Sequence, residues 1–318
     1  ILEALYTLSH GTSWRGRDKD MVRHDTTTAR LNARLSDKSS RQLELSTPET
    51  RLQKKFILNK TTHKRLQFSQ KVPVVLFDPD ILRTLSGSPS RRRDYLDDLL
   101  SRTHANYGVM LHRYERALAQ RNELLKSSVR DSSQQWQDHL FVWDIKLAEL
   151  ATYLISARLK LIDLYNQQLS DYYGRIASTP TTLSIVYSAT VDPATYSHDM
   201  IHALQRNLQA DRLRGFTSFG PHRDDISVLI NGYPAADVAS RGELRSIMLA
   251  MKLIEVDTLK DIFGSQPLLL LDDVFSELDA TRRNTLVAVM KQTQTIITTT
   301  DADTISDQLH ATILRTNL

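Results

Sequence analysis

The stretch LLLLDDVFSELD at residues 268–279 decides the fold class of this chain. Its four leucines do not alternate with polar residues, which is typical of a parallel strand buried on both faces. After it, TRRNTLVAVMKQ has a helical pattern, and TIITTT is a second apolar strand rich in β-branched residues. Strand, helix and strand make a βαβ unit, so we predict an α/β protein with a parallel sheet.

Two adjacent carboxylates, Asp272 and Asp273, follow this strand. They lie at the carboxyl edge of the predicted sheet, where ligands of open α/β proteins bind. One carboxylate can hold a magnesium ion while its neighbour positions or activates a water molecule. The alternative is a strand that simply runs out into solvent. Ser276, Glu277 and Asp279 favour a site, because with the acids they reproduce the Walker B and D-loop arrangement of ABC-type ATPases.

A second candidate site lies about thirty residues earlier, in VASRGELRS at residues 238–246. Ser240 and Gly242 stand at or just before a predicted helix, whose first N–H groups and dipole can bind an anion. The alternative is an ordinary serine N-cap. The order and the approximate spacing of this segment and the acid pair are those of the ABC signature and Walker B.

A third segment, TSFGPHRDD at residues 217–225, has the composition of a functional loop. Its roles could be to orient a phosphate or to lock the loop through a pair between Arg223 and a carboxylate. His222, Asp224 and Asp225 are also conceivable metal ligands, but no further ligand cluster accompanies them.

The remaining segments predict a head with an insertion. Residues 1–85 begin with the helix ILEALYTLS, and ARLNARLSD, RQLELST and KKFILNK favour an antiparallel meander. VPVVLF is a buried strand. From Ser90 to about Tyr173 two long amphipathic helices, with a break at residues 131–133, predict an antiparallel hairpin. We predict a split α/β head, residues 1–85 and 181–318, with an inserted helical lobe at residues 86–180.

Composition limits the class of protein. The chain has 318 residues, 41% hydrophobic and 25% charged, enough for more than one lobe. The absence of cysteine excludes disulfides, thiolate metal sites and cysteine nucleophiles. No apolar run reaches the roughly 18 to 20 residues of a membrane helix, and no leader pattern opens the sequence, so we expect a cytoplasmic protein without a membrane partner.

Basic residues are clustered rather than spread, since a net charge of +4 excludes a basic coat over the whole surface. The densest cluster contains Arg51, Lys54, Lys55, Lys60, Lys64 and Arg65, and a second contains residues 91–93. Lys54, Lys55 and Lys64 are the candidate DNA contacts. The alternative for each cluster is a solvated face.

Taken together, several motifs resemble the RecF family of SMC-like recombination mediators over the whole chain. They are ILEALYTLSHGTSWRGRDKDMVRHD, VVLFDPDILRTLSGSPSRRRDYLD, TSFGPHRDD, SRGELRS, LLLLDDVFSELD and TTTD. GPHRDD and GSPSRRR are much more specific than the general ATPase motifs. The resemblance implies the α/β fold of an ABC/SMC-type ATPase head, a mixed sheet with an antiparallel β part, and an inserted antiparallel helical lobe.

The resemblance also implies a function. Family members act in DNA replication, recombinational repair and the SOS response, bind ATP with Mg²⁺, and form ATP-dependent homodimers on DNA. Their DNA partners are single- and double-stranded DNA and gapped junctions. Their protein partners are RecR and RecO, with which they support RecA loading at single-strand gaps.

Site roles carry over to matching positions. Asp272 resembles the magnesium ligand and Asp273 the adjacent catalytic carboxylate. Ser240, Arg241 and Gly242 resemble the signature that reaches the γ-phosphate on the other subunit. Asp279 resembles the D-loop acid, and Thr300 and Asp301 stand at the switch position. Arg15 resembles an arginine loop near phosphate or DNA.

One motif of such ATPases is missing, because neither GxxxxGKS nor GxxxxGKT occurs in the sequence. We expect this phosphate-binding loop to precede Ile1 and the chain alone to be inactive as an ATPase. The alternative function is a non-catalytic DNA- or RecR-binding module. A transporter ATPase subunit is a weaker third hypothesis, against which the GPHRDD loop and the helical insertion argue.

Overall fold

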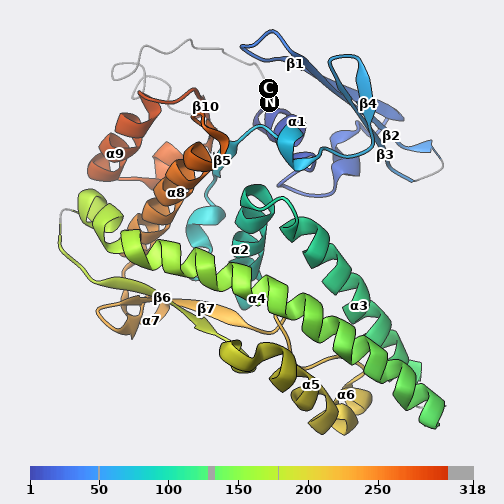
Figure 1. Ribbon diagram of the computed structural model, residues 1–318. Coiled ribbons are helices and arrows are strands. Elements are labelled where there is room, and N and C mark those ends of the chain that lie inside the picture. The colour runs from blue at the N-terminus through green and yellow to red at the C-terminus, as the bar shows by residue number, and fades with distance from the viewer. Residues whose placement is uncertain (49–50, 128–132, 178, 300–318) are drawn as a thin grey trace. The chain divides into compact units, whose positions relative to one another are not determined.

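The computed structural model describes residues 1–48, 51–127, 133–177 and 179–299 (Figure 1). The chain divides into two compact units, residues 1–81 with 255–318 and residues 82–254. Helix α8 (Arg241–Phe263) contains residues of both. Short 3-10 helices lie at Asp18–Met21, Phe68–Gln70, Ile81–Arg83, Pro193–Thr195 and Val274–Glu277.

The first unit contains the predicted parallel sheet. Its strands are β5 (Val74–Phe77), β9 (Leu268–Asp272) and β10 (Thr295–Thr298), in the order β10, β9, β5. Helix α9 (Ala280–Met290) connects β9 to β10. The βαβ prediction is therefore confirmed. Phe77 pairs with Leu271, and Thr298 pairs with Asp272, so the three strands end side by side.

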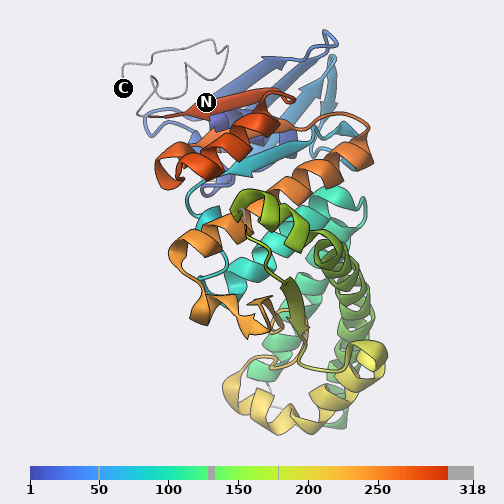
Figure 2. The same cartoon turned by 90° about the vertical axis from the view of Figure 1, so that its left-hand side faces the viewer.

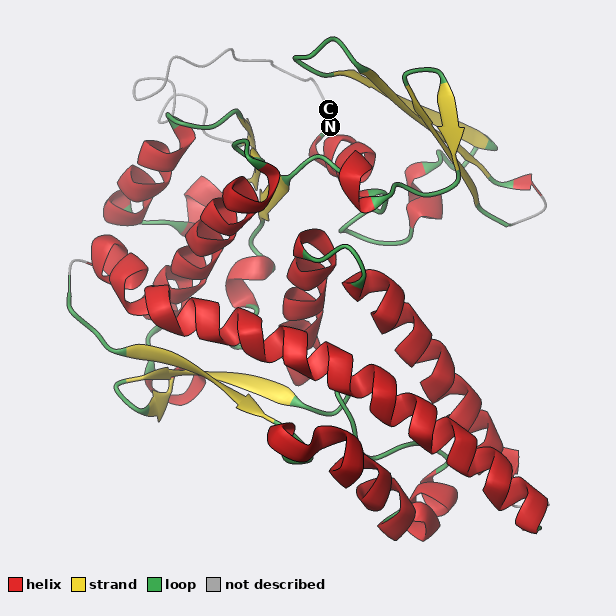
Figure 3. Cartoon of the chain, in the orientation of Figure 1, coloured by secondary structure: helices red, strands yellow, loops and turns green. Residues whose placement is uncertain are grey.

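A second, antiparallel sheet completes this unit and confirms the predicted meander. It contains β1 (Thr28–Arg34), β2 (Ser40–Ser46), β3 (Gln53–Leu58) and β4 (Thr61–His63), which pair in sequence order. These strands are labelled in Figure 1, and Figure 3 draws strands in yellow. Alternate residues face a buried cluster of Leu8, Val22, Leu43, Leu45 and Phe56. The opposite face of β1, β2 and β3 is polar except for Ile57.

Helix α1 (Leu2–His10) contacts both sheets. Leu2 and Tyr6 pack against the parallel sheet, whereas Leu8 packs against the antiparallel one. The helix ends at Gly11, whose φ of 98° is in the left-handed region and allows its N–H to bond Thr7 O. The loop that carries Arg15 begins there.

The second unit is built on α2 (Pro89–Thr103), α3 (Tyr107–Ser127) and α4 (Gln134–Ala177). Helices α3 and α4 lie side by side and antiparallel (Figures 1 and 2), with the fully buried Arg121 donating to Asp144 at 2.6 Å across the pair. The same guanidinium donates to Asp211 at 2.9 Å. Within the described residues, no helix is long and apolar enough to cross a membrane.

The prediction of one long helix from Ser90 to the break was wrong, because α2 and α3 are separate. His104 has an extended backbone, with φ −126° and ψ 117°, and ends α2. The turn buries Tyr107 completely, and its hydroxyl donates to Asp97 of α2 at 2.5 Å. Tertiary burial thus breaks the helix without a proline.

A small antiparallel sheet belongs to the same unit. Strand β6 (Leu183–Ser188) pairs with β7 (Asp225–Ile230), which pairs with β8 (Tyr233–Pro234). The predicted Asn-Gly hairpin turn is confirmed, since Asn231 and Gly232 have φ of 51° and 87°. The unit also contains α5 (Tyr196–Arg206), α6 (Leu208–Arg214) and α7 (Ala235–Val238).

The compact units are divided differently from the predicted 1–85, 86–180 and 181–318 segments. Strand β6 is attached to α4, because the Asn166 amide bonds Ile185 N and O at 2.6 and 3.0 Å. Ser170 of α4 also accepts from Leu183 N at 2.9 Å. These contacts bring the small sheet into one compact unit with the helices, while the functional division into head and lobe stays a prediction.

Candidate functional site

The carboxyl edge of the parallel sheet brings together residues that are far apart in the sequence. Asp272 is the last residue of β9, and its two carboxylate oxygens have different partners. The Thr298 hydroxyl donates to Oδ1 at 2.7 Å, and the Arg15 guanidinium donates to Oδ2. Arg15 also lies over the Trp14 ring, 5.5 Å from its centroid. The carboxylate of Asp272, the hydroxyl of Thr298 and the long guanidinium side chain of Arg15 therefore meet at the carboxyl edge of the parallel sheet.

Asp273 has a strained and incompletely bonded position beside this group. Its φ of 51° and ψ of 28° are left-handed, and its N–H donates to Thr298 O at 3.0 Å. The Ser276 hydroxyl lies 3.3 Å from Oδ2. Oδ1 is buried and accepts no hydrogen bond from the described part of the chain. Such an oxygen costs free energy, and it can accept a hydrogen bond or a proton from a reacting water.

Asp279 has a local structural role at the start of α9. Its carboxylate accepts from Arg282 N at 3.0 Å and pairs with the Arg282 side chain. This is the geometry of an N-cap. Its predicted place at a dimer seam stays a prediction.

Asp272 and Asp273 are side chains of the type that holds a magnesium ion in nucleotide sites. Among the residues that the structure describes, no group of three His, Asp or Glu side chains is placed to bind a metal ion by itself. Magnesium in nucleotide sites commonly takes one or two carboxylates and completes its shell with phosphate oxygens and water. Asp272 with the Thr298 hydroxyl beside it suits that use, since Arg15 already places positive charge against the same carboxylate.

The predicted signature segment starts α8. Ser240 and Glu243 form a capping box, with Ser240 N donating to the Glu243 carboxylate at 2.8 Å and Glu243 N donating to Ser240 Oγ at 3.2 Å. The N-cap interpretation is therefore confirmed. Next to the cap, a pocket of about 330 Å³ is lined by Arg83, Ser86, Arg241, Leu244 and Arg245. Three guanidinium groups at a helix start suit an anion of high charge.

Comparisons with known proteins agree with this picture. No family model matches the chain. It is 33% identical over 313 residues to the DNA replication and repair protein RecF of Clostridium beijerinckii, covering 97% of this chain and 84% of the relative. It is 35% identical over 315 residues to that of Streptococcus pyogenes serotype M4, covering 96% and 83%. The chain belongs to the RecF family.

A solved structure extends the similarity to the fold. The recombination mediator protein RecF with ATP, of the RecFOR pathway, matches with a TM-score of 0.83 and 30% identity, over 95% of this chain and 83% of that one. The α/β fold of this RecF-family chain, with its parallel and antiparallel sheets, is therefore that of an ABC/SMC-type ATPase, as predicted.

In this RecF-family chain, Asp224 of the GPHRDD segment is a buried anchor. It is fully buried and accepts four hydrogen bonds. The Tyr187 and Tyr196 hydroxyls donate to Oδ2 at 2.8 and 3.2 Å, and Thr190 N and Oγ1 donate to Oδ1 at 2.7 and 2.8 Å. This carboxylate holds the segments around it together and is not available to a metal.

The GPHRDD and GSPSRRR motifs bind each other. Arg92 of α2 makes a bidentate pair with Asp225, at 2.9 and 2.6 Å, and Arg93 donates to Asp224 O at 2.8 Å. Burial alone would raise the pKa of Asp225, but Arg92 outweighs it and holds the pKa below its usual value. Arg92 is thus the residue that holds the GPHRDD segment in place. The predicted pair of Arg223 with a carboxylate is absent from the described residues, and its guanidinium lies over Phe216 instead.

His222 is held as a neutral imidazole. Its Nε2 donates to Thr217 O at 3.1 Å, so its Nδ1 accepts from the Tyr114 hydroxyl at 2.6 Å. Burial lowers the pKa of His222 to about 4. Gly220 is required beside this pair, because its φ is 127° and a Cβ there would lie 2.5 Å from the Tyr114 hydroxyl.

The predicted DNA contacts fall on different sides of the first unit. Lys54 is three-quarters buried on the inner face of β3, where it pairs with Asp18 and donates to Gly11 O at 2.9 Å. Lys55 points outward and lies 3.5 Å from Glu44, and Lys64 is exposed. Because successive strand residues face opposite sides, Lys54 cannot share a surface with Lys55. Thr300 and Asp301 lie outside the described residues.

Two sets of site residues escaped the sequence reasoning. Thr298 contacts Asp272 because of the register between β9 and β10, for which TIITTT alone gives no signal. Arg245 lies one helical turn after Arg241, so a helix pattern could have found it. Arg83 comes from a distant segment, and only the fold places it at the same pocket.

Proposed function

We propose that this chain is a nucleotide-dependent switch that acts on DNA. Membership of the RecF family supports a part in DNA replication and repair. In the proposal, ATP with Mg²⁺ joins two copies of the protein on DNA, and hydrolysis separates them. With RecR and RecO, the joined form would support RecA loading at single-strand gaps.

The observation that carries the ATPase proposal is the unsatisfied Oδ1 of Asp273 beside the bonded carboxylate of Asp272. In hydrolysis this oxygen would accept a hydrogen bond from the attacking water and hold it in line with the γ-phosphate. Magnesium, when bound, would neutralise charge on the phosphate oxygens. Asp272 would hold that ion, and Thr298 would orient the Asp272 carboxylate.

The pocket at the start of α8 supports a site shared between two copies. Arg83, Arg241 and Arg245 gather positive charge beside the N-cap Ser240. A triphosphate held by a second copy supplies a matching negative charge. Binding in this pocket would therefore join two copies only while the γ-phosphate is present.

Asp273→Asn tests the catalytic role. The change keeps size but removes the charge that positions water, so ATP binding should persist while turnover falls by about 100-fold or more. The assay uses a version of the chain with a phosphate-binding loop ahead of Ile1. Asp261→Asn, the same change at an exposed acid of α8, is the matched control and should leave turnover unchanged. Equal turnover in Asp273→Asn and the control would contradict the role.

A non-catalytic DNA- or RecR-binding module is the second candidate. It is favoured by the three guanidinium groups at the start of α8, since they can bind an anion such as a phosphate without any hydrolysis. ATP turnover by the extended version excludes it. Binding of DNA or RecR without any turnover by that version would establish it.

A further inference from the structure

The outer face of the antiparallel sheet is a distinct basic surface. Directly opposed residues of paired strands share a face, so the register defines it. Its members are Thr28, Arg30, Asn32 and Arg34 of β1, Ser40, Gln42, Glu44 and Ser46 of β2, and Gln53, Lys55 and Ile57 of β3. The other face of the same strands packs on the buried cluster. The outer face is therefore open to a partner.

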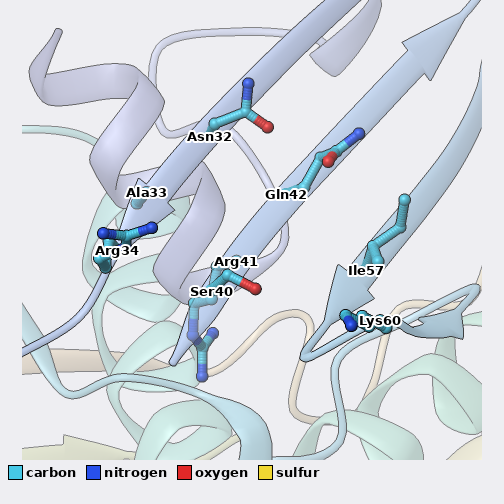
Figure 4. A pocket seen from close by; sticks show the side chains of 8 residues that line it. All are labelled: Asn32, Ala33, Arg34, Ser40, Arg41, Gln42, Ile57 and Lys60. Atoms are coloured by element: carbon cyan, nitrogen blue, oxygen red, sulfur yellow. The ribbon is translucent and has the colours of Figure 1, made fainter. Parts of the chain in front are cut away.

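A shallow pocket of about 400 Å³ lies on this face (Figure 4). Asn32 and Gln42 stand side by side on β1 and β2, and Ile57 continues the row on β3. Arg34 and Lys60 flank the pocket, Arg41 also lines it, and no acidic residue does. The lining thus offers neutral hydrogen-bond donors among three cations.

The neighbouring row adds further positive charge. Glu44 lies 3.0 Å from Arg30 and 3.5 Å from Lys55, so one carboxylate is shared by two cations. It is the one acid among the outer-face residues of β1, β2 and β3. With Arg34 and Lys60, four cations therefore stand against a single acid.

This chemistry fits the DNA backbone. Contacts to phosphate and sugar come from Arg, Lys, Ser, Asn and Gln side chains, which are the types found here. Arg30 and Lys55 share Glu44, whereas Arg34 and Lys60 form no ion pair with the described residues. Arg34 and Lys60 are therefore the two cations of this face that are available to phosphate groups.

The face suits duplex rather than single-stranded DNA. Proteins that bind single strands without sequence preference stack bases on aromatic side chains. None of the outward residues of β1, β2 and β3 is Phe, Tyr or Trp, and Ile57 is the one large apolar side chain among them. The core of a protein–protein interface is enriched in aromatic side chains and methionine, and this row contains neither.

We propose that the backbone of duplex DNA binds across this outer face, with Arg34 and Lys60 as phosphate contacts and Asn32 and Gln42 as donors between them. The proposal rests on the proposed function in that the chain acts on DNA. It requires neither nucleotide nor a second copy. Binding should be independent of base sequence.

The test compares two double variants by fluorescence anisotropy with a labelled duplex, over a range of salt concentrations. Arg34→Ala with Lys60→Ala should lower the slope of log affinity against log salt by about 1.8, because each phosphate contact contributes about 0.9. At 0.1 M salt this corresponds to about 60-fold weaker binding. Arg113→Ala with Arg116→Ala removes the same charge from exposed positions on α3 and should leave the slope unchanged.

Two further variants separate charge from folding. Arg34→Lys with Lys60→Arg keeps both cations and should bind duplex nearly as the parent does. Asn32→Asp with Gln42→Glu keeps the shape of the pocket, replaces donors by negative charge, and should weaken binding without lowering the melting temperature. An unchanged slope in the alanine pair, an equal loss in the α3 pair, or tighter binding of single strands than of duplex would overturn the proposal.

The outcome is independent of the ATP switch. Duplex binding is measured without nucleotide, and ATP-driven dimerisation is measured separately on the version with a phosphate-binding loop. If dimerisation fails while the alanine pair still lowers the slope, the DNA surface stands and the switch does not. If dimerisation holds while the slope is unchanged, the surface is wrong and the switch stands.

Discussion

Asp224 and Asp225 are adjacent acids for which the same substitution should have very different costs. Asp224 is fully buried and accepts four hydrogen bonds, whereas the Asp225 side chain is 26% exposed and forms an ion pair with Arg92. Asparagine keeps one carbonyl oxygen and turns the other acceptor into a donor. At position 224 it therefore loses about two bonds to a charged acceptor, each worth about 1.5–3 kcal/mol.

We expect Asp224→Asn to lower the free energy of unfolding by about 4 kcal/mol. Asp225→Asn should lower it by about 1 kcal/mol, since partly exposed ion pairs contribute little. For a unit of this size, about 2–4 °C per kcal/mol converts these values to melting shifts of roughly 10 and 3 °C. Urea unfolding followed by circular dichroism, with a thermal scan, measures both. Equal shifts at the two positions, or a larger one at Asp225, would refute the anchoring role.

Two further predictions concern the same loop. Burial lowers the pKa of His222 to about 4, so the native state resists protonation that the unfolded chain accepts below about pH 6.5. Above pH 6.5 His222 is neutral in both states and the free energy of unfolding is at its full value. As the pH falls from 6.5 toward 4, His222 lowers the free energy of unfolding, by about 2 kcal/mol at pH 5. His222→Gln should remove that part of the pH dependence in denaturant titrations, and identical pH profiles would contradict it. Gly220→Ala should cost about 3 kcal/mol, because its Cβ would meet the Tyr114 hydroxyl at a positive φ. In α4 a Cβ at Gly174 would have no atom within 4 Å, so Gly174→Ala should raise the free energy of unfolding by up to about 1 kcal/mol. Equal losses of stability in the two variants would contradict the clash with Tyr114 as the cause of the cost at Gly220.

Local patterns predicted the elements that depend on nearby residues. The LLLL strand, the helix after it and the TIITTT strand have the expected types, because a strand buried on both faces needs a continuous apolar run. The Asn231-Gly232 turn was also predicted, since both residues tolerate positive φ.

Features that depend on distant contacts could not be predicted. The turn between α2 and α3 exists because Tyr107 is buried against Asp97, and its sequence contains no proline. The small sheet joins the helices through Asn166 and Ser170, which are ordinary polar residues in a helical pattern.

The same limit applies to the candidate site. Asp272 and Asp273 were predictable because adjacent acids end an apolar strand. The contact between Arg15 and Asp272 joins positions 257 residues apart, and the position of Arg83 near Arg241 also depends on the fold. A lock of the GPHRDD segment by an arginine and a carboxylate was predicted, but its arginine is Arg92, which comes from a distant part of the sequence, and not Arg223.

The central claim is that two copies share each ATP site, and a mixture of two variants tests it most directly. The variants are made in a version with a phosphate-binding loop ahead of Ile1. Ser240→Arg would block the helix start that, in the proposed shared site, faces the partner's γ-phosphate, and should prevent dimerisation. Asp273→Asn should dimerise with ATP and turn it over about 100-fold or more slowly.

Mixed together, the two variants can form a dimer in which the intact Ser240 of one copy faces the intact Asp273 of the other. We predict that the mixture hydrolyses ATP faster than the sum of the separate variants. Turnover equal to that sum, together with unchanged dimerisation of Ser240→Arg alone, would contradict the shared site.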